Sequence, residues 1–253
     1  MKAAALRAKI ESAIEGRVPS PFKYYPDAPL ETVPTLISEL DALTGGIPRG
    51  ALTEICGPES SGRTGLLISI LASIASQGEV CALVDASDAL DPHSLARAGM
   101  DSKHLLWVRC RNIQQALRSA DLLLQGGGFG MLTLDLAGFP ARIVRRIPLS
   151  TWFRFRRAVE HTRTVLVILG HEPSAKSCSS LTLQMEPQMT RWLQAGADGA
   201  PDLALGFSPA CAGALYCGPS HCTLLGGVRL NALVTRFRKF VPSRISLTTR
   251  AAW

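Results

Sequence analysis

One eight-residue segment, Gly57–Thr64, constrains the fold of this 253-residue chain more than any other part of its sequence. It reads Gly-Pro-Glu-Ser-Ser-Gly-Arg-Thr, follows the apolar run Ala51–Cys56, and precedes a helical pattern over residues 67–74. A glycine-rich turn between a strand and a helix points backbone N–H groups and the helix N-terminus at phosphate oxygens. The segment fits the phosphate-binding P-loop pattern at every place except the lysine, which is Arg63 here. The alternative is a Gly/Ser-rich turn that merely caps a helix.

Strand-length apolar runs alternate with helical patterns through the middle of the chain, and no internal repeat is visible. Helical spacing recurs over residues 67–74 and 113–124. Such alternation predicts an α/β fold with a mostly parallel sheet that is covered by helices on both faces. The predicted strands are Ala51–Cys56, Val80–Asp85, Leu105–Arg109, Met131–Leu136 and Val165–Leu169.

The chemistry expected of this loop is binding of ATP and Mg²⁺. Thr64 would supply a magnesium-binding hydroxyl, and Asp135, at the end of an apolar strand, would hold magnesium as a Walker B carboxylate. A guanidinium is planar and bulkier than an ammonium, so Arg63 predicts weak nucleotide binding without efficient hydrolysis. The predicted nucleotide-binding residues are Gly57, Pro58, Glu59, Ser60, Ser61, Gly62, Arg63, Thr64 and Asp135.

Four stretches of the chain resemble the RecA family. They are Leu40–Gly50, the phosphate loop, Asp85–Pro92, and the run from Ala98 through Leu117 to Asp135. The resemblance spans roughly residues 36–169 and implies a RecA-like P-loop core. The approach Ile47-Pro-Arg-Gly50 and a basic C-terminal region are more similar to ImuA-like proteins, the RecA-related members of bacterial mutagenic repair cassettes.

Three departures from the RecA pattern argue against a working recombinase. The resemblance places Ser87 where the family has the glutamate that activates water, and a hydroxyl is too weak a base for that task. The neighbouring Asp88 is shifted by one residue and is expected to point elsewhere. The loop after Val165–Leu169 is short, and His171 stands there at the position of the family's nucleotide-sensing glutamine or is simply a solvated strand-end histidine. With Arg63, these changes favour a protein that is not an ATPase.

The resemblance implies a RecA-like accessory protein of the bacterial DNA damage (SOS) response that supports translesion synthesis. Its implied partners are an inactive Y-family polymerase homologue and a C-family polymerase, or RecA. Single-stranded DNA and further copies of the chain are additional candidate partners. The alternative is an ATP-dependent RecA-type recombinase, or a DNA-stimulated ATPase.

A basic segment follows the second strand-end carboxylate. Between Arg142 and Arg163 there are seven arginines and one acid, Glu160. Ser150 is a candidate N-cap for a helix that turns Trp152, Phe155 and Val159 to the sheet. Arginines would neutralise DNA phosphates and aromatics would stack on bases; alternatively, the aromatics are core and the arginines a solvated face. The predicted DNA-binding residues are Arg142, Arg145, Arg146, Arg154, Arg156 and Arg157.

Three regions are expected along the chain. Residues 1–34 hold a short helix and a proline-rich arm, and residues 35–202 hold the degenerate P-loop core. Residues 203–253 contain no Asp or Glu, and this basic region completes the core, contacts DNA or docks an acidic partner. The net charge of +7 favours an anionic partner. The absence of a signal peptide or membrane segment, with seven irregularly spaced cysteines, predicts a cytoplasmic protein.

Overall fold

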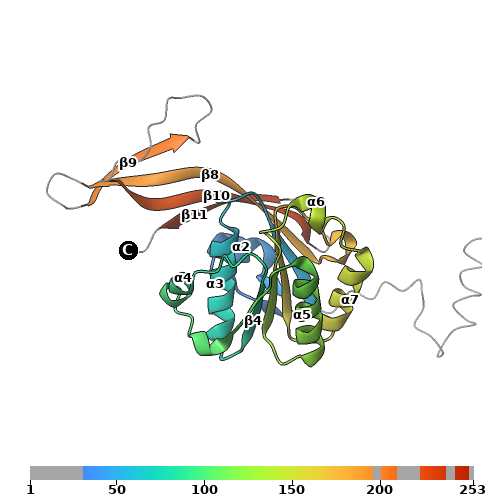
Figure 1. Cartoon of the computed structure of the whole chain (residues 1–253). Helices are drawn as coiled ribbons and strands as arrows, with labels where there is room; N and C mark the ends of the chain where they lie inside the picture. Colours follow the sequence, from blue (N-terminus) through green and yellow to red (C-terminus); the bar gives the residue numbers. More distant parts are fainter. Residues whose placement is uncertain (1–30, 196–200, 210–222, 238–242, 251–253) are drawn as a thin grey trace, which may run out of the picture. The chain divides into compact units, whose positions relative to one another are not determined.

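The computed structural model describes residues 31–195, 201–209, 223–237 and 243–250. A twisted central sheet runs through the molecule with helices on both sides (Figure 1). The strands are β1 (Thr32–Val33), β2 (Ile47–Pro48), β3 (Ala51–Cys56), β4 (Cys81–Asp85), β5 (Leu105–Arg109), β6 (Met131–Asp135), β7 (Val165–Gly170), β8 (Leu181–Ala195), β9 (Pro201–Pro209), β10 (Thr223–Phe237) and β11 (Ser243–Arg250). The helices are α2 (Ser38–Thr44), α3 (Arg63–Ala75), α4 (Pro92–Arg97), α5 (Ile113–Gly126), α6 (Ala141–Val144) and α7 (Leu149–Val159).

The order of strands in the main sheet is β11-β10-β8-β3-β7-β6-β4-β5, and β9 pairs with β8. Pairing is parallel from β8 through β3 to β5, and antiparallel among β8, β9, β10 and β11. The five strands predicted from the sequence are therefore confirmed, and all of them lie in the parallel part of the sheet, which β8 extends. Strands β1 and β2 form a separate antiparallel pair.

Alternation along the parallel strands builds two hydrophobic cores, because successive side chains point to opposite faces of a sheet. On β7, Val165 and Val167 pack beneath α3 and α4, whereas Leu166 and Ile168 pack beneath α5 and α7. All four side chains are buried. These strands read as continuous apolar runs because helices cover both faces of the sheet.

Side-chain caps set the starts of α4 and α5, and a proline precedes the start of α7. The Asp91 carboxylate accepts hydrogen bonds from the His93 and Ser94 N–H groups and so begins α4, and the Asn112 side chain accepts one from Gln115 N–H at the start of α5. Helix α7 begins at Leu149, with Pro148 as its N-cap, so the predicted capping by Ser150 is wrong. The fixed φ of proline prepares the helix start without a side-chain cap.

The C-terminal region of the sequence contributes strands to this sheet. β10 pairs with β8 and β11 pairs with β10, and Leu230, Ala232 and Leu247 are buried in the core beneath α3. The helix expected within residues 1–30 lies outside the described residues. No helix in the described part of the chain is long and apolar enough to cross a membrane.

Candidate nucleotide-binding site

The segment between β3 and α3 adopts a tight loop that requires its glycines. Gly57 and Gly62 have φ values of +156° and +84°, in the region that favours glycine. A Cβ at Gly57 would lie 2.3 Å from the Met185 carbonyl oxygen, and one at Gly62 would lie 2.2 Å from Leu230 Cδ1. Strands β8 and β10 therefore pack directly against the loop. Pro58, Glu59 and Ser60 are exposed, whereas Ser61 is buried.

Arg63, the residue in place of the P-loop lysine, is turned inward. Its side chain is 9% exposed, and Nη1 donates a hydrogen bond to the Gly170 carbonyl oxygen at 2.5 Å. Burial lowers the pKa of the guanidinium, an effect that Asp135 partly opposes. The next residue, Thr64, is exposed at the start of α3. The Arg63 guanidinium is thus held by a backbone carbonyl at the end of β7.

Two carboxylates end adjacent strands beside the loop. Asp85 and Asp135 are paired in register on β4 and β6. Burial raises the pKa of Asp135, the Asp85 carboxylate adds to that rise, and a hydrogen bond from Ala137 N–H opposes it. Thr64 and Asp135 together supply the hydroxyl and carboxylate oxygens that Mg²⁺ prefers. Their role as magnesium ligands stays a prediction.

The Asp85 carboxylate is used for hydrogen bonds within the fold. It is 1% exposed, and its carboxylate accepts hydrogen bonds from the Ser87 and Leu90 N–H groups and from Trp107 Nε1, the last at 3.2 Å. The sequence did not indicate Trp107, although its place on the strand next to β4 was a usable signal. The Arg109 guanidinium lies 4.9 Å from the centre of the Trp107 ring.

Ser87 and Asp88 point in different directions. Ser87 Oγ accepts a hydrogen bond from the Gly138 N–H at 2.8 Å and thereby joins the loops that follow β4 and β6. Asp88 instead forms an ion pair with Arg109 at the surface. The hydrogen bond that Arg109 donates in this pair lowers the pKa of the Asp88 carboxyl. The described geometry therefore offers no carboxylate at residues 87 and 88 facing the loop between β3 and α3.

Part of the chain is similar in sequence to known proteins. Residues 25–142 match the RecA N-terminal domain. The chain is 39% identical over 109 residues to Protein RecA of Kineococcus radiotolerans, and 38% identical over 134 residues to Protein RecA of Brucella anthropi. These matches cover 42% and 52% of this chain but only 31% and 37% of the relatives, so the matched part spans about a third of their length. This part of the chain is similar in sequence to the N-terminal domain of RecA.

The fold extends this likeness beyond the matched sequence. The structure resembles that of the RadB recombinase with a TM-score of 0.58, over 87% of this chain and 96% of that one. Only 15% of aligned residues are identical, so this likeness concerns the fold alone. The α/β fold predicted from the P-loop and the strand pattern, with its mostly parallel sheet, is confirmed.

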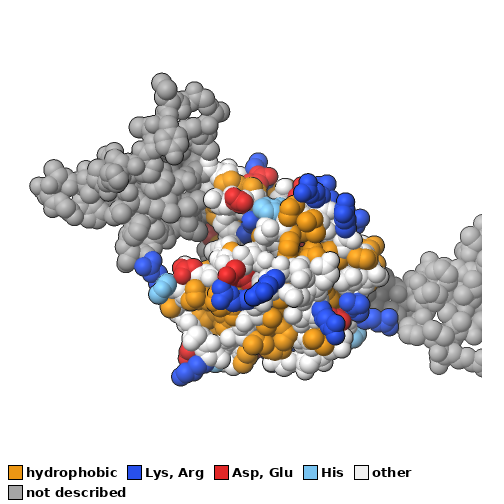
Figure 2. Space-filling model, in the orientation of Figure 1, with side chains coloured by type: hydrophobic (Ala, Val, Ile, Leu, Met, Phe, Trp, Pro, Cys, Tyr) orange, Lys and Arg blue, Asp and Glu red, His pale blue; other side chains and the backbone are white. Residues whose placement is uncertain are grey.

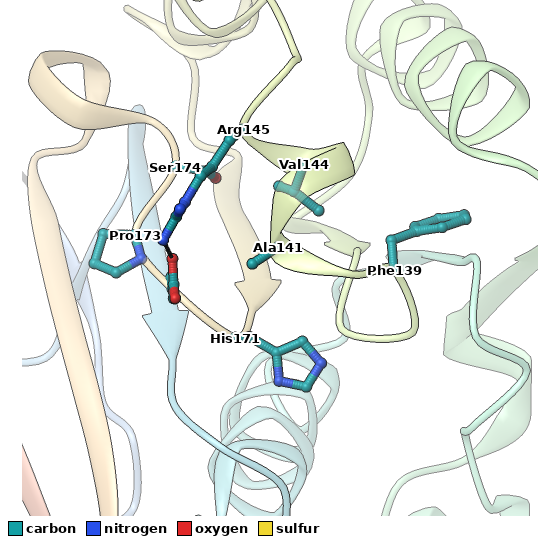
Figure 3. Close-up of a pocket in the computed structure, with 8 residues that line it drawn as sticks. Phe139, Ala141, Val144, Arg145, His171, Pro173 and Ser174 are labelled. Atoms are coloured by element: carbon teal, nitrogen blue, oxygen red, sulfur yellow. Dashed lines mark hydrogen bonds and ion pairs between the residues drawn. The ribbon is translucent and has the colours of Figure 1, made fainter.

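His171 follows β7 in the RecA-like core and lies near the strand-end carboxylates. Among the smaller influences on Asp135, the charge of His171 lowers the pKa of that carboxyl. Figure 3 shows a small pocket between the segments after β6 and β7, where Arg145 reaches to Glu172 and His171 points away from that ion pair. The pocket is lined by Phe139, Ala141, Val144, Arg145, His171, Glu172, Pro173 and Ser174.

The basic segment divides between two places in the fold. Arg142, Arg145 and Arg146 lie on and just after α6, near the strand ends, whereas Arg154, Arg156 and Arg157 lie on α7. Within the described residues, Arg145 pairs with Glu172 and Arg154 with Asp121, and no ion pair involves the other four. Trp152 and Phe155 are buried at 1% and 0% exposure, so these two aromatics face the core as expected.

The pH dependence of stability tests whether the folded protein disfavours ionisation of the buried Asp135 carboxyl. The pKa of Asp135 is raised in the folded protein, whereas in the unfolded chain it is about 3.9. The folded state therefore loses stability relative to the unfolded state as the pH rises above the unfolded pKa. Asp135→Asn keeps the oxygen that accepts from Ala137 and removes the charge. We expect its Tm at neutral pH to rise by about 2–4 °C, the response of a domain of this size to about 1 kcal/mol.

The same gain should vanish when the wild-type carboxyl is protonated. Below about pH 4 the two melting temperatures should converge, as thermal melts followed by circular dichroism would show. The exposed Glu160→Gln is the control and should show no such gain. A Tm for Asp135→Asn that is equal to or below the wild-type value at neutral pH would contradict the assignment of a buried, costly charge.

Proposed function

We propose that this protein is a RecA-like accessory factor of DNA repair that does not depend on ATP hydrolysis. The observation that carries the proposal is the contact of Arg63 Nη1 with the Gly170 carbonyl oxygen at 2.5 Å. A P-loop lysine holds nucleotide phosphates as a mobile point charge. Here the cation in that position is 9% exposed and bonded to backbone. It therefore stabilises the end of β7 instead of a transferring phosphoryl group.

The position of the water-activating glutamate supports the same proposal. Ser87 has no basic oxygen, and its hydroxyl is bonded to Gly138 N–H. Positioned general bases contribute about 10²–10⁴-fold to reaction rates, so a site without one turns over slowly even where nucleotide binds. The residues at two positions that an ATPase would use for catalysis, Arg63 and Ser87, are thus hydrogen-bonded within the chain.

Nucleotide binding without hydrolysis remains compatible with the site. The N–H groups of the loop and the N-terminus of α3 would hold phosphates, and Thr64 and Asp135 would hold Mg²⁺, which would neutralise phosphate charge. The ATPase alternative draws support from these retained residues and from the RecA relatives. A working ATPase would, however, require Arg63 to leave Gly170 and another group to act as base.

The biological setting that we propose is the bacterial DNA damage (SOS) response, in translesion synthesis. It rests on the ImuA-like features of the sequence, Ile47–Gly50 and the acid-free C-terminal region. In that setting the protein would act through contacts with an inactive Y-family polymerase homologue and a C-family polymerase, or with RecA, and with single-stranded DNA. The arginines of the basic segment supply the positive charge for such contacts.

ATP turnover separates the accessory role from the ATPase alternative. We expect purified protein to release phosphate from ATP only at background rate, with and without single-stranded DNA. Arg63→Lys alone should not raise that rate, because Ser87 still lacks a base; only Arg63→Lys combined with Ser87→Glu restores both groups. Phosphate release measured with a coupled assay provides the readout.

A matched variant guards this assay against contaminating ATPases. Thr64→Ala removes the expected magnesium-binding hydroxyl, so any rate that it retains in full comes from another protein. DNA-stimulated phosphate release by the wild type or by Arg63→Lys, lost in Thr64→Ala, would overturn the accessory role and favour the ATPase.

A further inference from the structure

The outer surface of α5 and α7 combines exposed apolar side chains with arginines. Leu122 on α5 is 61% exposed, and Phe153 and Leu149 on α7 are 47% and 39% exposed. An ion pair of 2.9 Å between Arg154 and Asp121 joins the two helices, which lie side by side on one face of the sheet (Figure 1). The α5–α7 surface is defined here as Arg118, Asp121, Leu122, Leu149, Phe153, Arg154, Arg156, Arg157 and Glu160.

Helical spacing arranges this surface in two rows. Leu149, Phe153 and Arg157 are four residues apart on α7, and Arg118 and Leu122 are four apart on α5. The opposite side of α7 holds Trp152, Phe155 and Val159 in the core, so the outer row is not needed for packing against the sheet. Figure 2 shows apolar and basic side chains next to each other on this face of the molecule. Exposed apolar side chains on neighbouring helices, bordered by charge, are the kind of feature found at interaction sites.

The charge of the α5–α7 surface is positive. Asp121 is matched by Arg154, which leaves Glu160 as the remaining acid against Arg118, Arg156 and Arg157. Within the described residues no ion pair involves these three arginines. An occupant with carboxylates around a few apolar anchors would complement both features of the surface.

The same residues suit protein better than nucleic acid. Binding of single-stranded DNA relies on aromatic faces for stacking, and Trp152 and Phe155 are buried. The exposed apolar residues other than Phe153 are leucines, which do not stack on bases.

We infer that the α5–α7 surface binds an acidic, leucine- or phenylalanine-containing segment of a partner protein, with Leu122 and Phe153 as its apolar contacts. This inference deepens the proposed accessory role and rests on it for the biological setting. The two are tested separately, since ATP turnover does not involve Leu122 or Phe153, and binding at this surface does not require Arg63 or Ser87.

Peptide selection on the full-length protein tests the inference without a named partner. Random displayed peptides of about 16 residues, long enough for a few helical turns, are selected on the wild type and sequenced. We expect the enriched peptides to share Asp or Glu next to Leu or Phe. Synthetic copies should bind Leu122→Asp and Phe153→Asp about ten-fold or more weakly than the wild type, because each variant adds a like charge and removes an anchor.

A matched variant and two further measurements make the result decisive. Leu106→Asp changes an apolar residue of β5 that is 41% exposed outside this surface, and it should bind the peptides like the wild type. Circular dichroism melts establish that each variant is folded. Three results would overturn the inference: no enrichment of acidic peptides, equal peptide binding by Phe153→Asp, or oligo(dT) binding that Phe153→Asp abolishes. A dimer that both surface variants convert to monomer would also overturn it, since the occupant would then be a second copy.

Discussion

Replacing Trp152 with alanine should destabilise the fold by about 3–5 kcal/mol, the usual cost of removing a fully buried tryptophan from a core. The side chain is 1% exposed and meets the Phe155 ring edge-to-face, with centroids 6.1 Å apart. It lies in the core between α7 and the sheet. Chemical denaturation followed by tryptophan fluorescence or circular dichroism measures the loss.

The neighbouring aromatic on the same helix provides the control. Phe153 is 47% exposed, so Phe153→Ala should change stability by about 0.5 kcal/mol or less. A Trp152→Ala protein with wild-type stability but weaker binding to single-stranded DNA would show that this ring serves as a stacking platform and not as core.

Replacing Arg49 with methionine should cost up to a similar amount, about 3 kcal/mol, because it removes the buried cation of a charge cluster whose acids are partly exposed. Arg49 is 3% exposed and donates to both carboxylate oxygens of Glu79, at 2.8 and 2.9 Å, and to the Arg163 carbonyl oxygen at 2.8 Å. Gln77 accepts a further hydrogen bond. The variant leaves the Glu79 carboxylate and a backbone carbonyl without their donor, and Tm should fall by about 6 °C.

Arg163 borders the same cluster and provides the comparison. Its side chain is 70% exposed and pairs with Glu31 at the surface, so Arg163→Met should cost about 1 kcal/mol or less. Equal losses for Arg49→Met and Arg163→Met would show that the cluster is held by surface charge and not by the buried guanidinium.

The parts of the fold that the sequence predicted are those set by local periodicity. The runs Ala51–Cys56 and Leu105–Arg109 became β3 and β5 with unchanged bounds, because short apolar runs rich in β-forming residues leave a clear pattern. The inward face of α7 was also predictable from helical spacing. Its start was not, because Ser150 has the right side chain for a cap but Pro148 begins the helix two residues earlier.

The contacts that decide the chemistry of the site join residues far apart in sequence. The Arg63–Gly170 and Ser87–Gly138 hydrogen bonds bridge 107 and 51 positions, and no local pattern announces either. The approach of Leu230 to Gly62 is of the same kind. The sequence could place Arg63 and Ser87 in the family's pattern and predict weakened catalysis, but their new partners emerged only from the folded chain.

The contact between Ser87 and Gly138 bears on how readily mutation could place a glutamate at position 87. A Cβ on Gly138 would lie 2.5 Å from Ser87 Oγ, so the serine and the glycine fit each other. Ser87→Glu replaces the hydroxyl that accepts from the Gly138 N–H with a longer side chain, and we expect this change alone to reduce stability. On the proposed function, selection acting one mutation at a time would tend to remove such intermediates, and a gain of ATP hydrolysis would therefore require two changes together.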